Sequence, residues 1–389
     1  MLRNFKKSIK IYFSIIIIIP IILFSYIWYY DPIQIFHKSF INKDIHLNKE
    51  MRQQIAGIIN NFEFDSIILG TSMLRNTSGF EASKLLDRNF ANLSFASSSF
   101  FERNMVISYA LKKKNIKTII FSLDNYYIDL SKTNTSYPIK NYDFLYDDNP
   151  LNDFKVYMND KYIDCIIRFS KESKCIGSIN NLDSPINWIN SKYYMQMFGG
   201  LDNWFKVAKN DYNAMKNTFS RIIENTNKIK NNEKVSLNNI NEKIAKSIIY
   251  VDEYLLDNVK KYSDTKFIFV FPPYSRINFA IWKQYNLPNY EIHKAIIKYL
   301  VEQSSIYKNL EIYGYEDKEF LDNISNYMDL IHYHPKINSM MLQSFKNKTE
   351  LLTIENVDKY IKIAEDKAQN YNLIEISNKI ENFIFNLNK

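Results

Sequence analysis

The sequence predicts an α/β fold built on a parallel sheet of about five strands. Short apolar runs rich in β-branched and aromatic residues alternate along the chain with segments whose apolar residues recur at helical spacing. The order strand, helix, strand is typical of a parallel, doubly wound sheet. The runs that we expect to form strands are residues 66–69, 91–93, 118–123, 266–271 and 310–313.

Amphipathic segments that we expect to form helices lie around these strands. They are residues 51–61, 80–86, 101–114, 215–229, 240–262 and 291–304. Residues 131–237 break the strand–helix alternation and predict a long, mostly helical insertion that covers or borders the functional site, because long segments within compact domains are often lids. Residues 346–389 predict a polar helical tail that packs on the domain or on a partner.

Five aromatic residues of the insertion allow two interpretations. They could line a sugar cleft, but a place in the core of the insertion is the simpler interpretation for large aromatic side chains. These residues are Trp188, Tyr193, Tyr194, Phe198 and Trp204.

The amino terminus predicts a retained membrane anchor. Basic residues Arg3, Lys6, Lys7 and Lys10 precede an apolar segment, residues 11–30, which is long enough to span a bilayer as a helix of about 20 residues. A cleaved signal peptide would have a shorter apolar region and end in small residues, and no such cleavage site follows. Because basic flanks stay in the cytoplasm, we expect the rest of the chain to lie outside it, with the protein a single-pass component of the cytoplasmic (inner) membrane.

Composition excludes several classes of protein. The net charge of +8 comes from Lys residues dispersed among Asp and Glu, without a nucleic-acid-binding motif, so we expect no nucleic-acid partner. With two cysteines, Cys165 and Cys175, the chain is not a disulfide-dense scaffold. Outside the cytoplasm these two could pair or remain buried thiols, and the sequence leaves both possibilities open.

We therefore expect the following organisation. Residues 1–10 form a cytoplasmic basic tail, 11–30 the anchor, 31–49 a connector, 50–345 an α/β domain with the insertion at about 131–237, and 346–389 the helical tail.

Two remote stretches carry the residues of a predicted catalytic site. Ser72 follows the first expected strand and Gly70, so its hydroxyl lies at the carboxyl end of the strand, where open α/β sheets bind ligands. Serine needs a base to take its proton, and the base needs a third group to orient it. Asp329 and His332 are three residues apart, so one turn of chain can bring them together.

Oxyanion stabilisation and substrate binding call for further groups. The available oxyanion donors are the backbone amides of Ser72 and of Ser97 and Ser98, with the Asn125 side chain at the end of the third expected strand. The Pro-Pro pair at 272–273 ends the fourth strand and places Tyr274 and Arg276 on a loop at the same edge, as candidate substrate-binding residues. No further ligand joins His332 and His334, so we expect no metal, and nothing indicates a cofactor.

These motifs resemble the SGNH (GDSL-type) hydrolase superfamily. The resemblance rests on Gly-x-Ser at 70–72, Asn-Leu-Ser at 92–94 with small residues after it, Asn125, and Asp-x-x-His at 329–332. The anchor, the Pro-Pro-Tyr-Ser strand end and residues 326–333 are similar to its membrane-anchored bacterial branch, which includes proteins of D-alanyl-lipoteichoic acid synthesis and of exopolysaccharide O-acetylation. The resemblance implies a flavodoxin-like three-layer α/β/α fold over residues 65–335, without the insertion and tail.

Carried over to this chain, the resemblance implies that Ser72 is the nucleophile, His332 the base and Asp329 its orienting acid. Two departures concern the oxyanion hole. Ser97 or Ser98 stands where the family usually has glycine, and Asn125 lacks the glycine of the usual Gly-x-Asn.

The sequence thus predicts a membrane-anchored serine acyl-transfer enzyme that acts on a cell-envelope glycan. We expect O-acetylation through an acyl-Ser72 intermediate, with a membrane-bound O-acyltransferase as the donor partner and the glycan as acceptor. A carbohydrate esterase would use the same triad. A non-catalytic polysaccharide-binding protein of the same fold is the third possibility, and the altered oxyanion region favours it.

Overall fold

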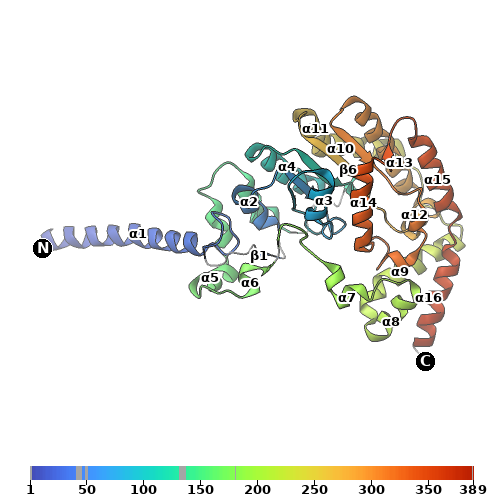
Figure 1. Cartoon of the computed structure of the whole chain (residues 1–389). Coiled ribbons are helices and arrows are strands. Elements are labelled where there is room, and N and C mark those ends of the chain that lie inside the picture. Colours follow the sequence, from blue (N-terminus) through green and yellow to red (C-terminus); the bar gives the residue numbers. More distant parts are fainter. Residues whose placement is uncertain (1, 41–45, 49–50, 131–136, 180, 388) are drawn as a thin grey trace. The chain divides into compact units, whose positions relative to one another are not determined.

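The structure of the chain is a computed structural model that describes residues 2–40, 46–48, 51–130, 137–179, 181–387 and 389 (Figure 1). The chain forms two compact units. The first comprises Met1–Glu63, Ser108–Lys114 and Tyr137–Leu182, and the second comprises Phe64–Ile107, Asn115–Ser136 and Asp183–Lys389.

The division differs from the predicted boundaries. The helix at the start of the expected α/β domain belongs to the first unit, together with the expected connector. The expected insertion is split, because Tyr137–Leu182 belongs to the first unit and the chain from Asp183 onward to the second. The predicted start of the insertion, at residue 131, lies outside the described residues.

A long apolar helix begins the first unit. Helix α1 spans Leu2–Tyr30, and its segment Ile9–Tyr30 is long and apolar enough to cross a membrane. Pro20 lies inside it without ending the helix. The other elements of this unit are β1 (His46–Leu47), α2 (Met51–Asn61), η3 (Ile139–Asn141), η4 (Asp143–Tyr146), η5 (Asp153–Tyr157), α5 (Asp160–Ile167), α6 (Ser173–Ile176) and β5 (Ser178–Ile179), where β1 and β5 pair antiparallel.

A disulfide closes the segment that holds α5 and α6. Cys165 of α5 and Cys175 of α6 are bonded, with their Cα atoms 5.6 Å apart. Both cysteines are buried beside apolar neighbours such as Tyr162 and Ile166. The structure therefore decides a pairing that the sequence leaves open.

We expect the Cys165→Ser, Cys175→Ser double variant to be destabilised. Opening a loop of this length returns conformational entropy to the unfolded chain and costs about 2–3 kcal/mol. The measurement is thermal unfolding of the full-length protein in detergent, oxidised against reduced. Dithiothreitol should lower the melting temperature of the wild type and leave that of the double variant unchanged. Equal melting temperatures for oxidised wild type and double variant would contradict this expectation.

A six-stranded sheet forms the centre of the second unit. Its strands are β2 (Ser66–Leu69), β3 (Phe90–Asn92), β4 (Thr118–Ser122), β6 (Lys266–Val270), β7 (Leu310–Tyr313) and β8 (Leu351–Leu352). They lie in the order β3-β2-β4-β6-β7-β8, in which the first five are parallel and β8 is antiparallel to β7. All five predicted strands are present to within one residue at either end, and β8 is an edge strand that the sequence analysis missed.

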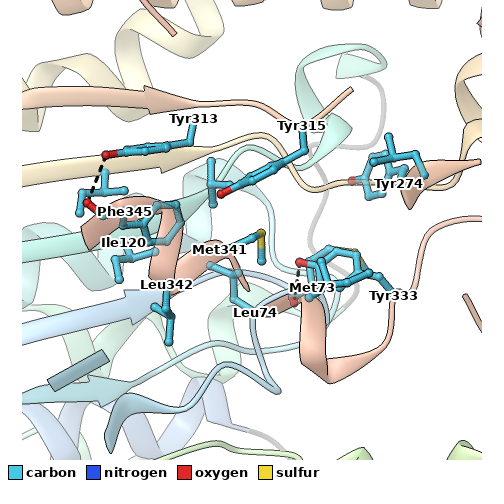
Figure 2. Packing of buried hydrophobic residues seen from close by; sticks show 14 of the residues in the cluster. Met73, Leu74, Ile120, Tyr274, Tyr313, Tyr315, Tyr333, Met341, Leu342 and Phe345 are labelled. Carbon is cyan, nitrogen blue, oxygen red and sulfur yellow. Dashed lines mark hydrogen bonds between the residues drawn. The ribbon is translucent and has the colours of Figure 1, made fainter. Parts of the chain in front are cut away.

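Successive side chains along each strand point to opposite faces of the sheet, so each strand contributes apolar residues to both faces. On one face, Ile68, Ile120 and Ile268 pack with residues of α3 (Gly79–Leu86) and α14 (Pro335–Asn347). Figure 2 shows part of this cluster, including Ile120 against Leu342. On the other face, the ring of Phe121 lies 5.6 Å from that of Phe100 in α4 (Phe100–Lys113).

Helix starts in this unit follow from capping residues. The Ser78 side chain accepts from the Glu81 amide and begins α3, and Ser99 exchanges hydrogen bonds with Glu102 at the start of α4. The second is a capping box, in which serine and glutamate satisfy amides that the first turn leaves free, whereas Ser78 caps α3 with its own side chain alone. The remaining helices are η1 (Asn125–Tyr127), η6 (Trp188–Asn190), α7 (Lys192–Met195), α8 (Leu201–Asn210), α9 (Tyr212–Lys230), α10 (Ile240–Val251), the π-helix η7 (Asp252–Leu256), α11 (Asp257–Lys261), α12 (Arg276–Gln284), α13 (Leu287–Ile306), η8 (Glu319–Leu321), η9 (Ile324–Asn326), α15 (Val357–Asn370) and α16 (Leu373–Leu387).

A second apolar cluster joins the remainder of the insertion to the carboxyl-terminal tail. Trp204 of α8 and Phe219 of α9 are fully buried in it, together with Ile281 of α12 and Ile380 of α16. The predicted tail is thus packed on its own domain. Trp188, Phe198 and Trp204 are core residues, whereas Tyr193 is half exposed and Tyr194 lies at the edge of the cluster.

Candidate functional site

Ser72 lies in a turn that is fixed at both sides. Strand β2 ends at Leu69, and Gly70 follows where a Cβ would lie 2.5 Å from the Ser122 Oγ of the neighbouring strand. No side chain fits there, so the close approach requires glycine. The Thr71 Oγ1 donates to Asp124 Oδ1 over 2.7 Å and accepts from the Met73 amide. Ser72 itself is partly exposed between these two residues.

The Asp124 carboxylate organises this edge of the sheet. It is buried, and it accepts from Thr71 and, over 2.6 Å, from the Ser122 hydroxyl. Arg103 is buried as well, with its Nη1 3.1 Å from Asp124 Oδ2 and 2.6 Å from the Ser122 carbonyl oxygen. The ion pair ties the turn after β2 to the end of β4 and to α4.

Asp329 and His332 occupy a narrow loop between η9 and α14. Tyr327 and Tyr333 pair as an isolated antiparallel bridge across its base, and the Met328 amide donates to the His332 carbonyl oxygen. The bridge places Met328 opposite His332, and at the tip of the loop the Asp329 carboxylate accepts from the His332 amide as well as from its ring.

The loop is held against the turn that carries Ser72. The Tyr333 hydroxyl donates to the Met73 carbonyl oxygen over 2.9 Å, a contact that Figure 2 shows. On the other side, the amide and hydroxyl of Ser275 both donate to the Leu330 carbonyl oxygen, at 3.1 and 2.7 Å. Two segments remote in the sequence are therefore braced together by buried hydrogen bonds.

Ser72, His332 and Asp329 form one hydrogen-bonded chain. Ser72 Oγ lies 2.9 Å from His332 Nε2, and His332 Nδ1 lies 2.6 Å from Asp329 Oδ2. The side chains of His332 and Asp329 are 22% and 31% exposed, so solvent and substrate can reach them. This arrangement can take a proton from the serine hydroxyl while the carboxylate fixes the tautomer of the imidazole.

The Asp329 carboxylate is held in its ionised form. Burial favours protonation, but the His332 ring and the amides of His332 and Ile331 outweigh it and hold the pKa of Asp329 below its usual range. Because the pKa of Asp329 is lower in the folded than in the unfolded protein, its ionised carboxylate stabilises the fold. This stabilisation is complete above the ordinary pKa of about 3.9 and is lost as the pH falls through the lowered pKa of the folded protein. The Asp329–His332 pair therefore persists through the mildly acidic range.

His334 takes no part in the hydrogen bonds that join Ser72, His332 and Asp329. Its Nδ1 accepts from the Lys336 amide and so caps α14, and its ring packs edge-on against Phe198. Burial, with Lys336 nearby, lowers the pKa of His334. The neutral ring that the cap requires is thus the favoured form.

The structure places the candidate oxyanion residues differently from one another. The Ser98 side chain is buried, and its hydroxyl donates to the carbonyl oxygens of Phe95 and Gly70. Ser97 is exposed and has a φ of 52°, a left-handed conformation that residues other than glycine rarely adopt. Asn125 lines a separate cleft of about 650 Å³ beside α10 and α13, and no described contact joins it to Ser72 or His332.

Two predicted substrate-binding residues are structural. Arg276 begins α12 and is fully buried, and its guanidinium is paired with Asp322 and donates to the carbonyl oxygens of Glu316 and Lys318. Tyr274 is buried, and burial raises its pKa well above the ordinary value, with a smaller effect from Asp124. The prediction for both residues is corrected, since neither presents a free polar group to a substrate.

Two further side chains lie near Asp329 and His332. The ring of Trp188 stands edge-on to that of His332, with centroids 5.6 Å apart, and the Trp188 amide donates to Asn76 in the turn after Ser72. Arg221 of α9 is exposed; the protein around it lowers the pKa of its guanidinium, and the charge of Asp329 partly offsets this shift. The sequence marks Trp188 only as one of the five aromatic residues of the insertion, and no motif marks Arg221.

No protein-family model matches the chain, and no curated protein matches its sequence. Within the described part of the chain, no group of three or more His, Cys, Asp or Glu side chains is placed to hold a metal ion. What the site can do follows from its geometry.

Proposed function

We propose that the protein is a membrane-anchored serine acyl-transfer enzyme of the SGNH type that modifies a cell-envelope glycan. The observation that carries the proposal is the hydrogen-bonded chain from Ser72 through His332 to Asp329. The strand order supports it, because the five parallel strands β3-β2-β4-β6-β7 have the order 2-1-3-4-5 of flavodoxin-like folds. Ser72 then lies at the carboxyl end of the first strand, beside the point where the strand order reverses.

In this mechanism His332 Nε2 accepts the proton of Ser72 as Oγ bonds to the acyl carbonyl carbon. The tetrahedral intermediate collapses, the donor's leaving oxygen takes the proton from His332, and acyl-Ser72 remains. A sugar hydroxyl then gives its proton to His332 and attacks the same carbon; as the bond from that carbon to Ser72 Oγ breaks, Oγ takes the proton from His332, which leaves the sugar ester and free Ser72. Asp329 stabilises the imidazolium in both steps.

The backbone amide of Ser72 is the best-placed oxyanion donor. It donates to no described residue, and it belongs to the nucleophile itself. The backbone conformation of Ser97 supports a second oxyanion donor at this position. Its φ is left-handed, as glycine readily adopts, and glycine is the residue found there in the family that the sequence resembles. No described contact joins Asn125 to Ser72 or His332, so we propose that catalysis does not depend on it.

Placement outside the cytoplasm rests on two independent features. The basic residues lie before the apolar segment of α1, which orients such helices with their amino terminus in the cytoplasm. The Cys165–Cys175 disulfide is typical of an oxidising compartment. The catalytic unit would then stand next to the outer face of the cytoplasmic membrane, where a membrane-bound O-acyltransferase could supply the acyl group.

The decisive experiment is detection of the acyl-enzyme. The purified full-length protein is mixed with p-nitrophenyl acetate, and intact mass and peptide mapping locate the adduct. We expect one acetyl group on Ser72, and its removal when an acceptor oligosaccharide is added. Loss of the adduct to water alone, with no acetylated sugar, would identify an esterase.

A non-catalytic, polysaccharide-binding role is the second candidate. The position of Asn125 favours it, since an oxyanion hole with one donor fewer loses about 3–4 kcal/mol of transition-state stabilisation. Absence of any acyl or phosphonate adduct on Ser72, together with binding of envelope glycan, would support this role over catalysis.

The Tyr333→Phe variant tests the bracing of the triad. The Met73 carbonyl oxygen loses its buried donor, which costs about 1–3 kcal/mol of stability and loosens the loop of Asp329 and His332. We expect kcat to fall while KM is unchanged, because a positioning residue touches no substrate. Tyr313→Phe is the matched control, since its hydroxyl contacts Glu311 and Phe345 in the same cluster but no residue of the triad. Equal kcat values for both variants would show that the brace is merely structural.

A further inference from the structure

Helix α5 of the first unit leaves two large apolar side chains uncovered. Ile163 and Ile167 are 45% and 70% exposed, and being four residues apart they lie on one face of the helix. Beside them on the helix, Tyr162 and Ile166 are buried in the unit. The first unit thus buries only part of the apolar surface of α5 and leaves the side chains of Ile163 and Ile167 exposed.

The end of α5 is attached to α1 inside the segment that is apolar enough to cross a membrane. The Tyr26 hydroxyl donates to the Ile167 carbonyl oxygen over 3.4 Å, and Tyr30 donates to that of Ser170. The ring of Phe169 lies 4.3 Å from that of Tyr26 and 5.3 Å from that of Tyr30.

The backbone conformation of Phe169 is unfavourable unless the packing of its ring on α1 stabilises it. Phe169 has a φ of 46°, and such left-handed positions after a helix normally hold glycine. The Ser170 amide donates to the Cys165 carbonyl oxygen and completes the turn. A bulky aromatic residue in this conformation indicates that its packing on α1 determines the turn.

A second contact reaches further along α1. The ring of Phe24 lies 4.5 Å from that of Phe154 in η5. Tyr26 is about one helical turn, roughly 5.4 Å, before the last residue of α1. The contacts with Phe24 and Tyr26 therefore lie below the end of the apolar segment, at the depth of the lipid headgroups and the outermost acyl chains.

We infer that the Ile163–Ile167 face of α5 is seated in the outer leaflet of the membrane next to α1. The occupant of this face is lipid, because the exposed isoleucines continue the apolar surface of α1, itself 58% exposed at Ile17. The ion pair at the end of α5 fits this placement, since Asp164 and Arg168, the residue that follows the helix, pair with each other and can remain in the headgroup layer. The inference rests on the proposed membrane anchoring, but it does not require the proposed catalysis.

The test is photocrosslinking of the full-length protein in its native membrane. A p-benzoylphenylalanine residue replaces Ile163, Ile167, Ile17 or Ile249 in turn, and mass spectrometry identifies the adducts. Ile17 lies in the middle of the apolar segment, whereas Ile249 is a 64% exposed isoleucine of the second unit. We expect phospholipid adducts at 163 and 167 in yields comparable to that at 17, and none at 249.

Each contrary outcome has its own meaning. Lipid adducts at 17 without adducts at 163 and 167 would overturn the inference and leave the anchor intact. Protein adducts at 163 and 167 would overturn it in favour of a protein partner. Absence of lipid adducts at all positions would refute the anchoring and the inference together, and lipid adducts at 249 as well would remove the specificity on which the inference depends.

Discussion

Substitution of Ser72 or His332 by alanine is expected to abolish turnover while leaving the fold intact. In the proposed mechanism Ser72 supplies the attacking oxygen, and His332 Nε2, which lies 2.9 Å from it, takes the proton. Removal of either member of such a chain lowers kcat by about four orders of magnitude or more. The measurement is the release of p-nitrophenol from p-nitrophenyl acetate by the full-length protein in detergent, with a phosphonate as an independent label of the serine.

The matched controls are Ser305→Ala and His334→Asn. The Ser305 hydroxyl is exposed on α13 and donates to a carbonyl oxygen of its own helix. Asparagine at position 334 can keep the cap of α14. Both controls should retain activity. If His334→Asn loses activity as completely as His332→Ala, the assignment of the base is wrong, and labelling of Ser72→Ala by the phosphonate would exclude Ser72 as the nucleophile.

The Ser72→Ala, His332→Ala double variant refines the test. Residues that act as one unit are not additive, so the double variant should be no slower than the slower single variant. Additive losses in log kcat would mean that the two residues act independently and would contradict the proposed proton transfer between them.

Local patterns were sufficient to predict the five parallel strands and the residues of the candidate site that the structure brings together. Ser66–Leu69 is a short apolar run that stops at Gly70, and Asp329 and His332 lie within one turn of chain. Both signals are local. The sequence therefore indicated three side chains that the structure joins by hydrogen bonds, and the expectation that they meet came from the rule that ligands bind at the carboxyl ends of parallel strands.

Residues whose role depends on remote partners could not be assigned in this way. Arg276 was expected on a binding loop, but the carbonyl groups that bury its guanidinium come from residues 316 and 318. The carbonyl partner of Ser275 is likewise 55 residues away. The start of α14 was missed for another reason, because Pro335 in its first turn is a local signal that the sequence analysis did not use.

The second large effect is expected for Asp124→Ala. Loss of this carboxylate leaves Arg103 charged and buried without a counterion, which typically costs about 3–5 kcal/mol. It also frees the hydroxyls of Thr71 and Ser122, so the turn that carries Ser72 loses its anchor on β4. We expect a lower melting temperature together with a loss of phosphonate labelling at Ser72.

The paired replacement Arg103→Met, Asp124→Leu separates the charge from the hydrogen bonds. Arg103 stacks on the rings of Phe100 and Phe121, at 4.9 and 4.3 Å, so methionine can fill much of the same apolar space. The double variant should regain most of the stability that Asp124→Ala loses, because no unpaired charge remains. It should not regain the labelling of Ser72, because the Thr71 hydroxyl still lacks its acceptor. Glu242→Ala, which removes an exposed pair with Lys246, is the control and should leave the melting temperature nearly unchanged, because exposed ion pairs contribute little to stability. A double variant that labels normally would show that the Ser72 turn holds its shape without Asp124, and the rigidity of the nucleophile would then have to come from Gly70 and the Tyr333 brace alone.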